Sequence, residues 1–408
     1  MREWLLHLLV LTGFVEGVVV GPVSAGRVMF VVALLVVVLT LAADPDTRIV
    51  PHPAVGIPAV LLFAWVLVSG AWAGSRGSWL GSLYELVLAL GFFTAYTVLI
   101  SSRDVVRRLL ITFAVGALVV APLGIVQAAQ AGRAIGLQGD PNTYALYQLA
   151  ALPIAVFLAV RAQGWARAGW SLTAVLLVAS VLAAQSRGAA VALVLVAFWL
   201  LWDGAGTKVT PAQRGVRIVA GGVTTVAAYS VAALWFPRFE PEAAIEGGGT
   251  GRWEIWRAAL QGWQERPWLG LGAGNFEAQS GRLLSQTPGL DLDPHSVIFD
   301  GIKVHNMYLE PLVDLGPVGL ATVLALLAGT AALLVQDRRR HPTDVIGALV
   351  PMLLGFAVAA TFLSAVSNKL LWALAGFAAA LPYVAQPRGG LHSEQSKDRL
   401  REPPGGVR

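Results

Sequence analysis

The sequence has no cysteine and little charge of either sign. Without cysteine, disulfide bonds and thiol chemistry are excluded. Charged residues make up 13% of the 408 positions, against about 25% in a typical soluble domain, which argues against an ordinary soluble fold. Lysine is scarce, so most of the positive charge is arginine. The lysines are Lys208, Lys303, Lys369 and Lys397.

Hydrophobic residues make up 56% of the chain, with a mean hydropathy of +0.68. They fall in blocks of about 16–22 residues, the length that spans a bilayer. The sequence therefore predicts an all-α integral membrane protein with about twelve transmembrane helices. The expected spans are Trp4–Val20, Gly26–Ala43, Ala54–Trp72, Trp79–Ile100, Arg107–Gln127, Asn142–Val160, Gly169–Gln185, Gly188–Trp202, Val216–Phe236, Leu315–Val335, Asp344–Ser364 and Lys369–Val384. The seventh and eighth blocks are short, and the alternative is one broken helix.

Loop charges predict the orientation, because basic residues favour the cytoplasmic side. With the N-terminus inside, the inner connections carry thirteen basic residues: Arg2, Arg48, Arg103, Arg107, Arg108, Arg161, Arg167, Lys208, Arg214, Arg217, Arg338, Arg339 and Arg340. The short outer loops carry five: Arg27, Arg76, Arg133, Arg187 and Lys369. Both termini are therefore expected inside. The net charge of +5 is explained by topology and does not imply nucleic-acid binding.

The expected organisation is one polytopic membrane domain over residues 1–386, with a large outer loop at 237–305. Residues 387–408 are rich in proline, glycine and charge, which predicts a disordered cytoplasmic tail. No cleavable signal peptide is expected, since the first apolar block is followed at once by another.

The outer loop is expected to contain short helices. Thr250 is a candidate N-cap, and Arg266-Pro267 should end the helix that it begins. Apolar side chains recur along one face of that helix at Trp253, Trp256, Leu260 and Trp263. The alternative role for these tryptophans is to rest on lipid headgroups, independently of any catalysis.

Polar residues expected at the outer face suggest a phosphate site. Arg187 and Arg252 carry planar guanidinium groups, which bind phosphoryl oxygens in pairs. The Thr250-Gly251 helix start offers free backbone N–H groups. Near them, with Lys303 two residues before it, His305 has a pKa suited to taking a proton from a hydroxyl. These groups together suit transfer from a phosphate leaving group to an alcohol.

Each of these residues also has a purely structural interpretation. Arg187 would anchor a helix end at the interface. Arg252 would pair with Glu254 or Glu240 on the surface, and His305 would be a hydrogen-bonded interfacial histidine.

Other polar groups carry weaker signals. Gly270, Gly272 and Gly274 follow no strand, so a tight backbone turn is favoured over a nucleotide site. A loop cluster fits no standard metal spacing and is interpreted as a solvated surface; its members are Asp291, Asp293, His295 and Asp300. Glu16 and Glu85 lie near the ends of apolar blocks and remain candidates for function or for structure.

Several short motifs together resemble the O-antigen ligase family of bacterial membrane glycosyltransferases. They are His305-Asn306 followed after nine residues by Gly316-x-x-Gly319, Arg252-x-x-x-Trp256, the Pro267 to Phe276 segment with its Asn275, Ser186-Arg187-Gly188, and Asp140-Pro141-Asn142. The resemblance covers residues 138–320 approximately. The histidine motif is the most specific, and the two short tripeptides are weak alone.

The resemblance implies a GT-C-like transferase that moves a glycan from an undecaprenyl-diphosphate carrier to an acceptor, using no nucleotide sugar, cofactor or metal. Arg187 and Arg252 match the family arginines that hold the diphosphate, and His305 matches the histidine proposed to activate the acceptor. The supporting residues are Asn306, Gly316, Gly319, Asn142 and Asn275. Asn306 is expected to orient the histidine loop, and the two glycines to let the tenth helix pack closely. The acceptor implied is a glycan, a glycolipid or a protein.

Two alternatives stay open within and beyond this family. A polymerase would extend the carrier-linked glycan instead of joining it to a separate acceptor. A transporter for lipid-linked sugars would share the many-span plan, but it should carry charge at the bilayer midplane and repeat symmetry between its halves. Charges within the spans are scarce and the halves look unlike, so a transferase is favoured over a transporter or a structural scaffold.

Overall fold

The structure is a computed structural model, and it describes residues 2–20, 23–43, 50–207, 210–222, 251–288 and 301–384. Its long helices are α1 Arg2–Thr12, α2 Ala25–Ala43, α3 Pro53–Ser69, α4 Arg76–Leu99, α5 Arg103–Ala131, α6 Pro141–Arg161, α7 Gly164–Ala183, α8 Arg187–Asp203, α11 Arg252–Glu265, α12 Asn275–Gln286, α13 Leu309–Arg340, α14 Leu349–Ala359 and α15 Lys369–Val384. Short 3-10 turns are η1 Gly204–Gly206, η3 Val345–Ala348 and η4 Ala360–Phe362. One antiparallel hairpin pairs β1 Val19–Val20 with β2 Val23–Ser24. The predicted all-helical class is therefore confirmed, apart from this hairpin.

Seven helical segments are long and apolar enough to cross a membrane. Shorter apolar helices occupy four more of the predicted blocks, and the block Val216–Phe236 lies partly outside the described residues. The first block is wrong as a single span, because α1 ends at Thr12 and is only about 16 Å long. A bilayer core is about 30 Å thick. The expected total of about twelve spans stays a prediction.

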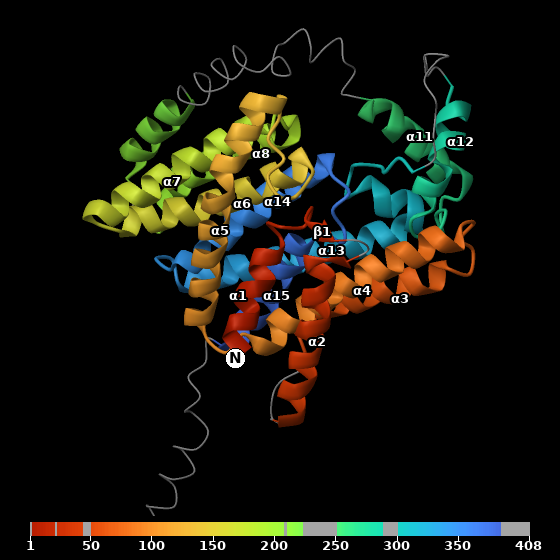
Figure 1. The fold of residues 1–408 in the computed structure, drawn as a ribbon, viewed down its shortest axis with the longest axis horizontal. Helices are drawn as coiled ribbons and strands as arrows, with labels where there is room; N and C mark the ends of the chain where they lie inside the picture. The colour runs from red at the N-terminus through yellow and green to blue at the C-terminus, as the bar shows by residue number, and fades with distance from the viewer. Residues whose placement is uncertain are drawn as a thin grey trace, which may run out of the picture.

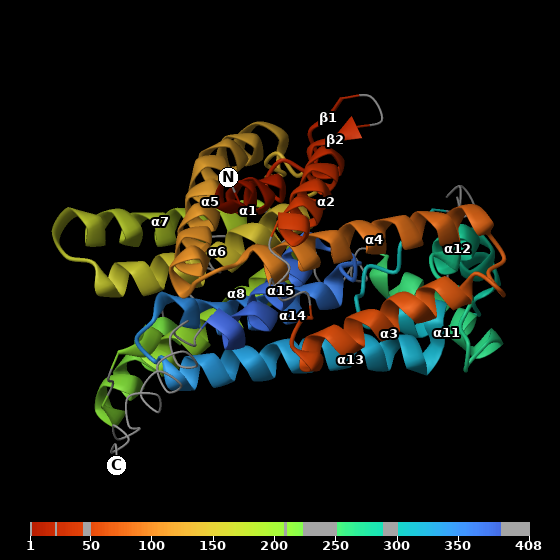
Figure 2. The same cartoon turned by 90° about the horizontal axis from the view of Figure 1, so that it is seen from below.

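The bundle is organised around α6, which has 78% of its most apolar window buried, whereas the peripheral α7 has 28%. Helix α6 packs against α7, α14, α5 and α8. Figure 1 shows α7 reaching outward on one side, while α11 and α12 lie on the other. Figure 2 shows α3 running beside α13 and α4 beside α3, with α11 and α12 at the end where α13 begins. The described part of the loop at 237–305 thus carries two short helices, α11 and α12, as the sequence predicted.

Polar side chains at the helix starts explain where the helices begin. Asp140 accepts a hydrogen bond from the Thr143 N–H at 2.7 Å, and Ser186 accepts one from the Ala189 N–H at 3.4 Å. Each satisfies a backbone donor that the first helical turn leaves without a partner. The Asp140-Pro141-Asn142 and Ser186-Arg187-Gly188 motifs therefore also mark the starts of α6 and α8.

An ion-pair network joins the helix ends farthest from His305. Arg103 bridges Asp337 at 2.5 Å and Asp344 at 2.8 Å, and Arg107 also reaches Asp344 at 2.8 Å. Arg338 pairs with Asp203 in the same region. All of these residues belong to or border connections that the charge pattern placed inside. Because α13 has 32 residues and a length of roughly 48 Å, this network and His305 lie at opposite ends of one helix.

Candidate functional site

Arg187 is the first residue of α8, directly after a sharp turn. Helix α7 ends at Ala183, and Gln185 adopts a left-handed conformation with φ 50°. The turn therefore separates α7 from α8, and both are long and apolar enough to cross a membrane. The Ser186 hydroxyl lies 2.9 Å from the Asn142 amide oxygen, which ties this turn to the start of α6. Among the described residues, Arg187 has no hydrogen bond or ion pair.

His305 lies in the segment that leads into α13 and is held from two sides. Its backbone N–H donates to the Ser364 hydroxyl at 3.1 Å, and the Met307 N–H donates to the Ala360 carbonyl at 2.9 Å. His305 has φ 53°, a left-handed conformation that is uncommon outside glycine and that occurs at functional sites. The contacts with Ala360 of η4 and with Ser364 just after it hold the histidine in this conformation.

Asn306 caps the helix that follows the histidine. Its side-chain oxygen accepts hydrogen bonds from the Tyr308 N–H at 2.9 Å and the Leu309 N–H at 3.0 Å. This geometry fits the expected role of Asn306 in orienting the histidine loop.

Phe362 joins the arginine motif of α11 to the start of α8. The Arg252 guanidinium carbon lies 5.8 Å from the centroid of the Phe362 ring, and the Trp256 ring lies 6.0 Å from it. On the other motif, a Cβ added at Gly188 would lie 2.6 Å from the same ring. Sequence analysis missed Phe362, because an aromatic residue inside an apolar block resembles any core residue.

The Trp256 indole also contacts the histidine segment, donating to the Val304 carbonyl at 3.1 Å. Arg252 and Trp256 are four residues apart and lie on one face of α11, so both reach this region. The outward-facing Trp253 is 61% exposed, which fits the alternative of a tryptophan at the membrane interface.

The pKa of His305 lies below its ordinary value. Burial of the imidazole is the main cause, and the charges of Arg252 and Lys303 add to it, while Asp140 acts in the opposite direction. His305 is therefore neutral near pH 7 and has a nitrogen able to accept a proton. Arg252 and Asp140, which come from separate motifs, are both close enough to influence it.

Lys303 remains a cation despite partial burial. Burial alone would lower its pKa, but the nearby carboxylates of Glu85, Glu277 and Glu310 raise the pKa above its ordinary value. Glu85 is thus paired, and Glu16 similarly pairs with Lys369 at 2.9 Å.

The glycine-rich segment 270–274 forms a backbone turn packed against α13. Gly270, Gly272 and Gly274 all have positive φ angles. The Leu271 and Gly272 N–H groups donate to the Val313 and Asp314 carbonyls at 2.9 and 2.8 Å. This is the backbone turn that the sequence favoured over a nucleotide site.

Gly316 breaks α13 at this contact. Its φ is 68° and its ψ −167°, and a Cβ there would lie 2.2 Å from the Trp268 carbonyl oxygen. A Cβ at Gly319 would meet the Leu315 side chain of the same helix at 2.2 Å. The two glycines thus permit a kink and the docking of the outer loop, whereas the sequence suggested close packing between helices.

Asn275 and Asp314 fix the start of α12. The Asn275 side-chain oxygen accepts from the Ser75 N–H at 2.6 Å, which connects the outer loop to α4. The Asp314 carboxylate accepts from the Gly274 and Phe276 N–H groups at 2.9 and 2.8 Å. Asp314 was not predicted, because it is one of the nine residues between Asn306 and Gly316 that the motif leaves unspecified.

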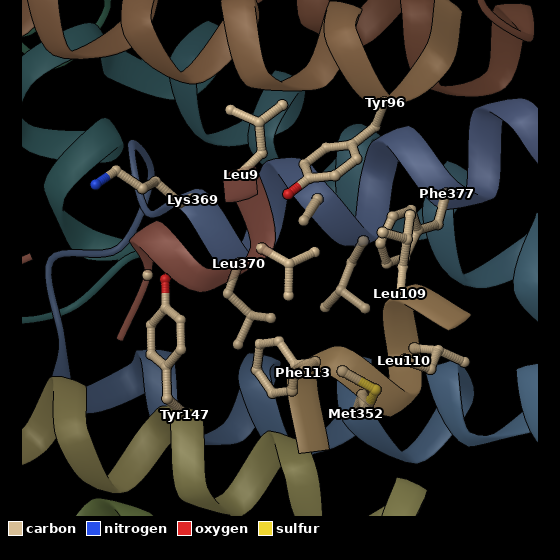
Figure 3. A pocket seen from close by; sticks show the side chains of 14 residues that line it. Leu9, Tyr96, Leu109, Leu110, Phe113, Tyr147, Met352, Lys369, Leu370 and Phe377 are labelled. Atoms are coloured by element: carbon tan, nitrogen blue, oxygen red, sulfur yellow. The ribbon is translucent and has the colours of Figure 1, made fainter. Parts of the chain in front are cut away.

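Within the described ranges, no group of three or more metal-binding side chains occurs. The loop acids that the sequence interpreted as a solvated surface lie outside these ranges, as do Thr250 and the tail. An apolar pocket inside the bundle has a volume of about 20 Å³, and Figure 3 shows Lys369 and Tyr147 at its edge. That volume suits about one water molecule, so this pocket is too small for a sugar.

Part of this chain is similar to a known family. Residues 172–324 match the model of the family described as O-antigen ligase. The match begins within α7 and ends within α13, and it includes Arg187, Arg252 and His305. No curated protein matches the chain.

Proposed function

We propose a reaction for this chain from the premise that its residues 172–324 match the O-antigen ligase family. The protein transfers a glycan from an undecaprenyl-diphosphate carrier to an acceptor hydroxyl at the outer face of the cytoplasmic membrane. The observation that carries the proposal is that Arg252 and the start of α8 both lie against Phe362, while the His305 backbone N–H donates to Ser364, two residues further along the chain. A cationic group and a neutral imidazole are the two elements that such a transfer requires.

In the proposed step, Arg187 and Arg252 bind the diphosphate. The acceptor hydroxyl gives its proton to His305, and its oxygen forms a bond to the anomeric carbon of the donor glycan. The bond from that carbon to the diphosphate oxygen breaks, and its electron pair leaves with the diphosphate. A single displacement inverts the anomeric configuration. The step uses no nucleotide sugar and no metal ion.

The orientation proposed for this reaction has both termini in the cytoplasm. Its support is the separation of charge along α13, with the arginine-rich network at one end and His305 at the other. The outer leaflet then meets the helix ends that carry Arg187 and Arg252, and a lipid-linked donor enters sideways from the bilayer.

The test uses purified protein in liposomes with a carrier-linked repeat unit, with and without separate acceptor glycans. Diphosphate-lipid release only after an acceptor is added supports ligation, and a product of inverted configuration supports the single displacement. A ladder of lengthening carrier-linked glycan would instead assign a polymerase. Equal behaviour of wild type and His305→Ala, with no release in either, would overturn the transferase and favour transport.

A further inference from the structure

A polar cavity of about 230 Å³ lies beside the histidine segment, among α4, the start of α12 and the first turns of α13. Its polar walls come from three parts of the chain that are distant in sequence. They are Ser78, Ser82, Glu85, Glu277, Lys303 and Glu310. None of these residues was assigned a role by the motifs.

The mouth of this cavity is already internally paired. Lys303 lies 3.9 Å from Glu85 and 4.0 Å from Glu277, and the three side chains are 42%, 53% and 41% exposed. Glu85 also accepts a hydrogen bond from Ser367 at 3.0 Å. The mouth is therefore exposed, and the positive charge of Lys303 offsets part of the negative charge of Glu85 and Glu277.

The floor of the cavity holds one carboxyl oxygen that accepts no hydrogen bond from the described residues. Asp314 is buried, and both its oxygens accept backbone N–H groups of the α12 start. The Glu310 Oε2 atom is buried and has no hydrogen-bond partner among the described residues. A buried carboxyl oxygen without a partner is costly, so it is a natural acceptor for a donor group on a ligand.

Glu310 lies one helical turn after the histidine segment. Its backbone N–H donates to the Asn306 carbonyl at 2.9 Å, and Asn306 directly follows His305. A ligand group held by Glu310 is therefore held close to the histidine.

The cavity and the site of the two arginines, Arg187 and Arg252, carry different charges and therefore favour different ligands. The acidic side chains of Glu85, Glu277, Glu310 and Asp314 line the cavity against the single cation of Lys303, and this excess of acids disfavours a diphosphate. Carboxylates, serines and an ammonium group supply acceptors and donors for neutral hydroxyl groups. The volume far exceeds the 10–15 Å³ or so that one water needs, and is below the roughly 300 Å³ of pockets for drug-sized ligands.

We propose that this cavity holds one neutral sugar ring of the acceptor, with Glu310 accepting hydrogen bonds from its hydroxyl groups. The inference rests on the proposed function, because it gives the acceptor a binding place beside His305 and apart from the arginines. Glu310 contacts the acceptor and sets the position of the attacking hydroxyl.

The test measures sugar binding separately from transfer. Full-length protein in nanodiscs is titrated with methyl glycosides of glucose, galactose, mannose and N-acetylglucosamine, and binding is followed by saturation-transfer NMR. A larger side chain at Gly81 is expected to fill the cavity, because Gly81 lines it and a Cβ added there would meet nothing within 4 Å. Gly77, one turn earlier on α4, has equally open space but does not line the cavity. Gly81→Leu is therefore the test and Gly77→Leu the matched control.

The expected result is a loss of binding of about tenfold or more in Gly81→Leu and in Glu310→Gln, with Gly77→Leu unchanged. Binding of the undecaprenyl-diphosphate donor should be the same in all three variants. If no ring binds wild type, or if Gly81→Leu binds as well as Gly77→Leu, the cavity is not a sugar site. Sugar binding that responds as expected without any glycan transfer would contradict the proposed function and leave the sugar site standing.

Discussion

The Arg252 guanidinium lies over the ring of Phe362, with its central carbon 5.8 Å from the ring centroid. The Ser186-Arg187-Gly188 motif lies against the same ring, so closely that Gly188 has no room for a side chain. Phe362 thus lies against both the first turn of α11 and the start of α8, the two helices that carry the proposed diphosphate-binding arginines. Neither motif contains Phe362.

This contact predicts that Gly188→Ala weakens the carrier site. The new methyl group would lie 2.6 Å from Phe362, so the ring or the start of α8 must shift, at a cost of about 1–3 kcal/mol. We expect a lower melting temperature and weaker carrier binding. Gly169→Ala is the matched control, since a Cβ there meets nothing within 4 Å. Equal carrier affinity in the two variants would show that the spacing of the arginines is unimportant.

The two arginines should be distinguishable from ordinary surface arginines by binding. Arg187→Ala and Arg252→Ala are each expected to weaken binding of a fluorescent undecaprenyl-diphosphate analogue by about tenfold or more, because each removes a charge-assisted contact. Arg252→Lys should restore little, since lysine lacks the planar fork. Arg282→Ala is the control, because Arg282 pairs with Glu265 on the loop surface. Normal affinity in Arg252→Ala would remove it from the clamp.

His305→Ala is expected to reduce turnover by about 10²–10⁴-fold while carrier binding stays unchanged. Single-turnover transfer and the binding assay together measure both quantities. A loss of carrier affinity of the same size would indicate a structural role for His305 in place of proton transfer. His305→Gln, which keeps a polar side chain but cannot take up the proton, should be as inactive as the alanine variant.

The pH dependence follows from the depressed pKa of His305. Only the neutral imidazole accepts a proton, so turnover should rise as pH passes through a pKa below the ordinary value of about 6.5 and stay level above it. Arg252→Gln removes one depressing charge and should move the midpoint upward, more than Lys303→Gln does. Because burial is the main cause, the midpoint should remain below 6.5. A kcat profile at saturating donor, beside an NMR titration of the imidazole, measures it. An unchanged midpoint in Arg252→Gln would show that the two groups are not coupled.

The helix break at Gly316 should tolerate no side chain. Gly316→Ala combines a left-handed φ with a Cβ 2.2 Å from the Trp268 carbonyl, so we expect a loss of about 2–4 kcal/mol in stability. Gly77→Ala, in open space within α4, should be neutral or stabilising by about 0.5–1 kcal/mol. Thermal unfolding in detergent compares the two. A Gly316→Ala protein as stable as wild type would contradict the docking of the loop on the kink.

At the other end of the bundle, Asp344 should be a point of acid sensitivity. Burial acts to raise its pKa, but hydrogen bonds from Arg107 and Arg103 hold the pKa at about 2. The stabilisation is therefore present above the unfolded value of about 3.9 and is lost as pH falls through about 2.

We expect Asp344→Asn to cost about 3 kcal/mol at pH 7, because it leaves two arginines without their shared partner. The gap from wild type, measured by thermal unfolding, should narrow below about pH 4. Asp104→Asn, which changes an exposed partner of Arg107, should cost less than about 1 kcal/mol. A similar cost for both variants would contradict this account of the network.

The sequence by itself determined the helical class and the place of the first loop helix, α11, and it predicted residues suited to phosphate and proton chemistry. Periodic apolar blocks, capping residues and runs of glycine act locally, so they can be recognised without knowing the fold. The turn at Gly270, Gly272 and Gly274 was predicted for this reason, and so was the start of α8 after Ser186.

Only the tertiary structure decided which of these local features meet. Phe362 and Ser364 connect to the candidate site through contacts with residues more than fifty positions away, and such pairings leave no periodic signal. The shortening of the first helix at Thr12 and the break at Gly316 depend on neighbours of the same kind. Hydrophobicity explains why the chain enters a bilayer. The packing of particular side chains against one another is what brings Arg252 and His305 together and leaves the cavity with Glu310 beside them.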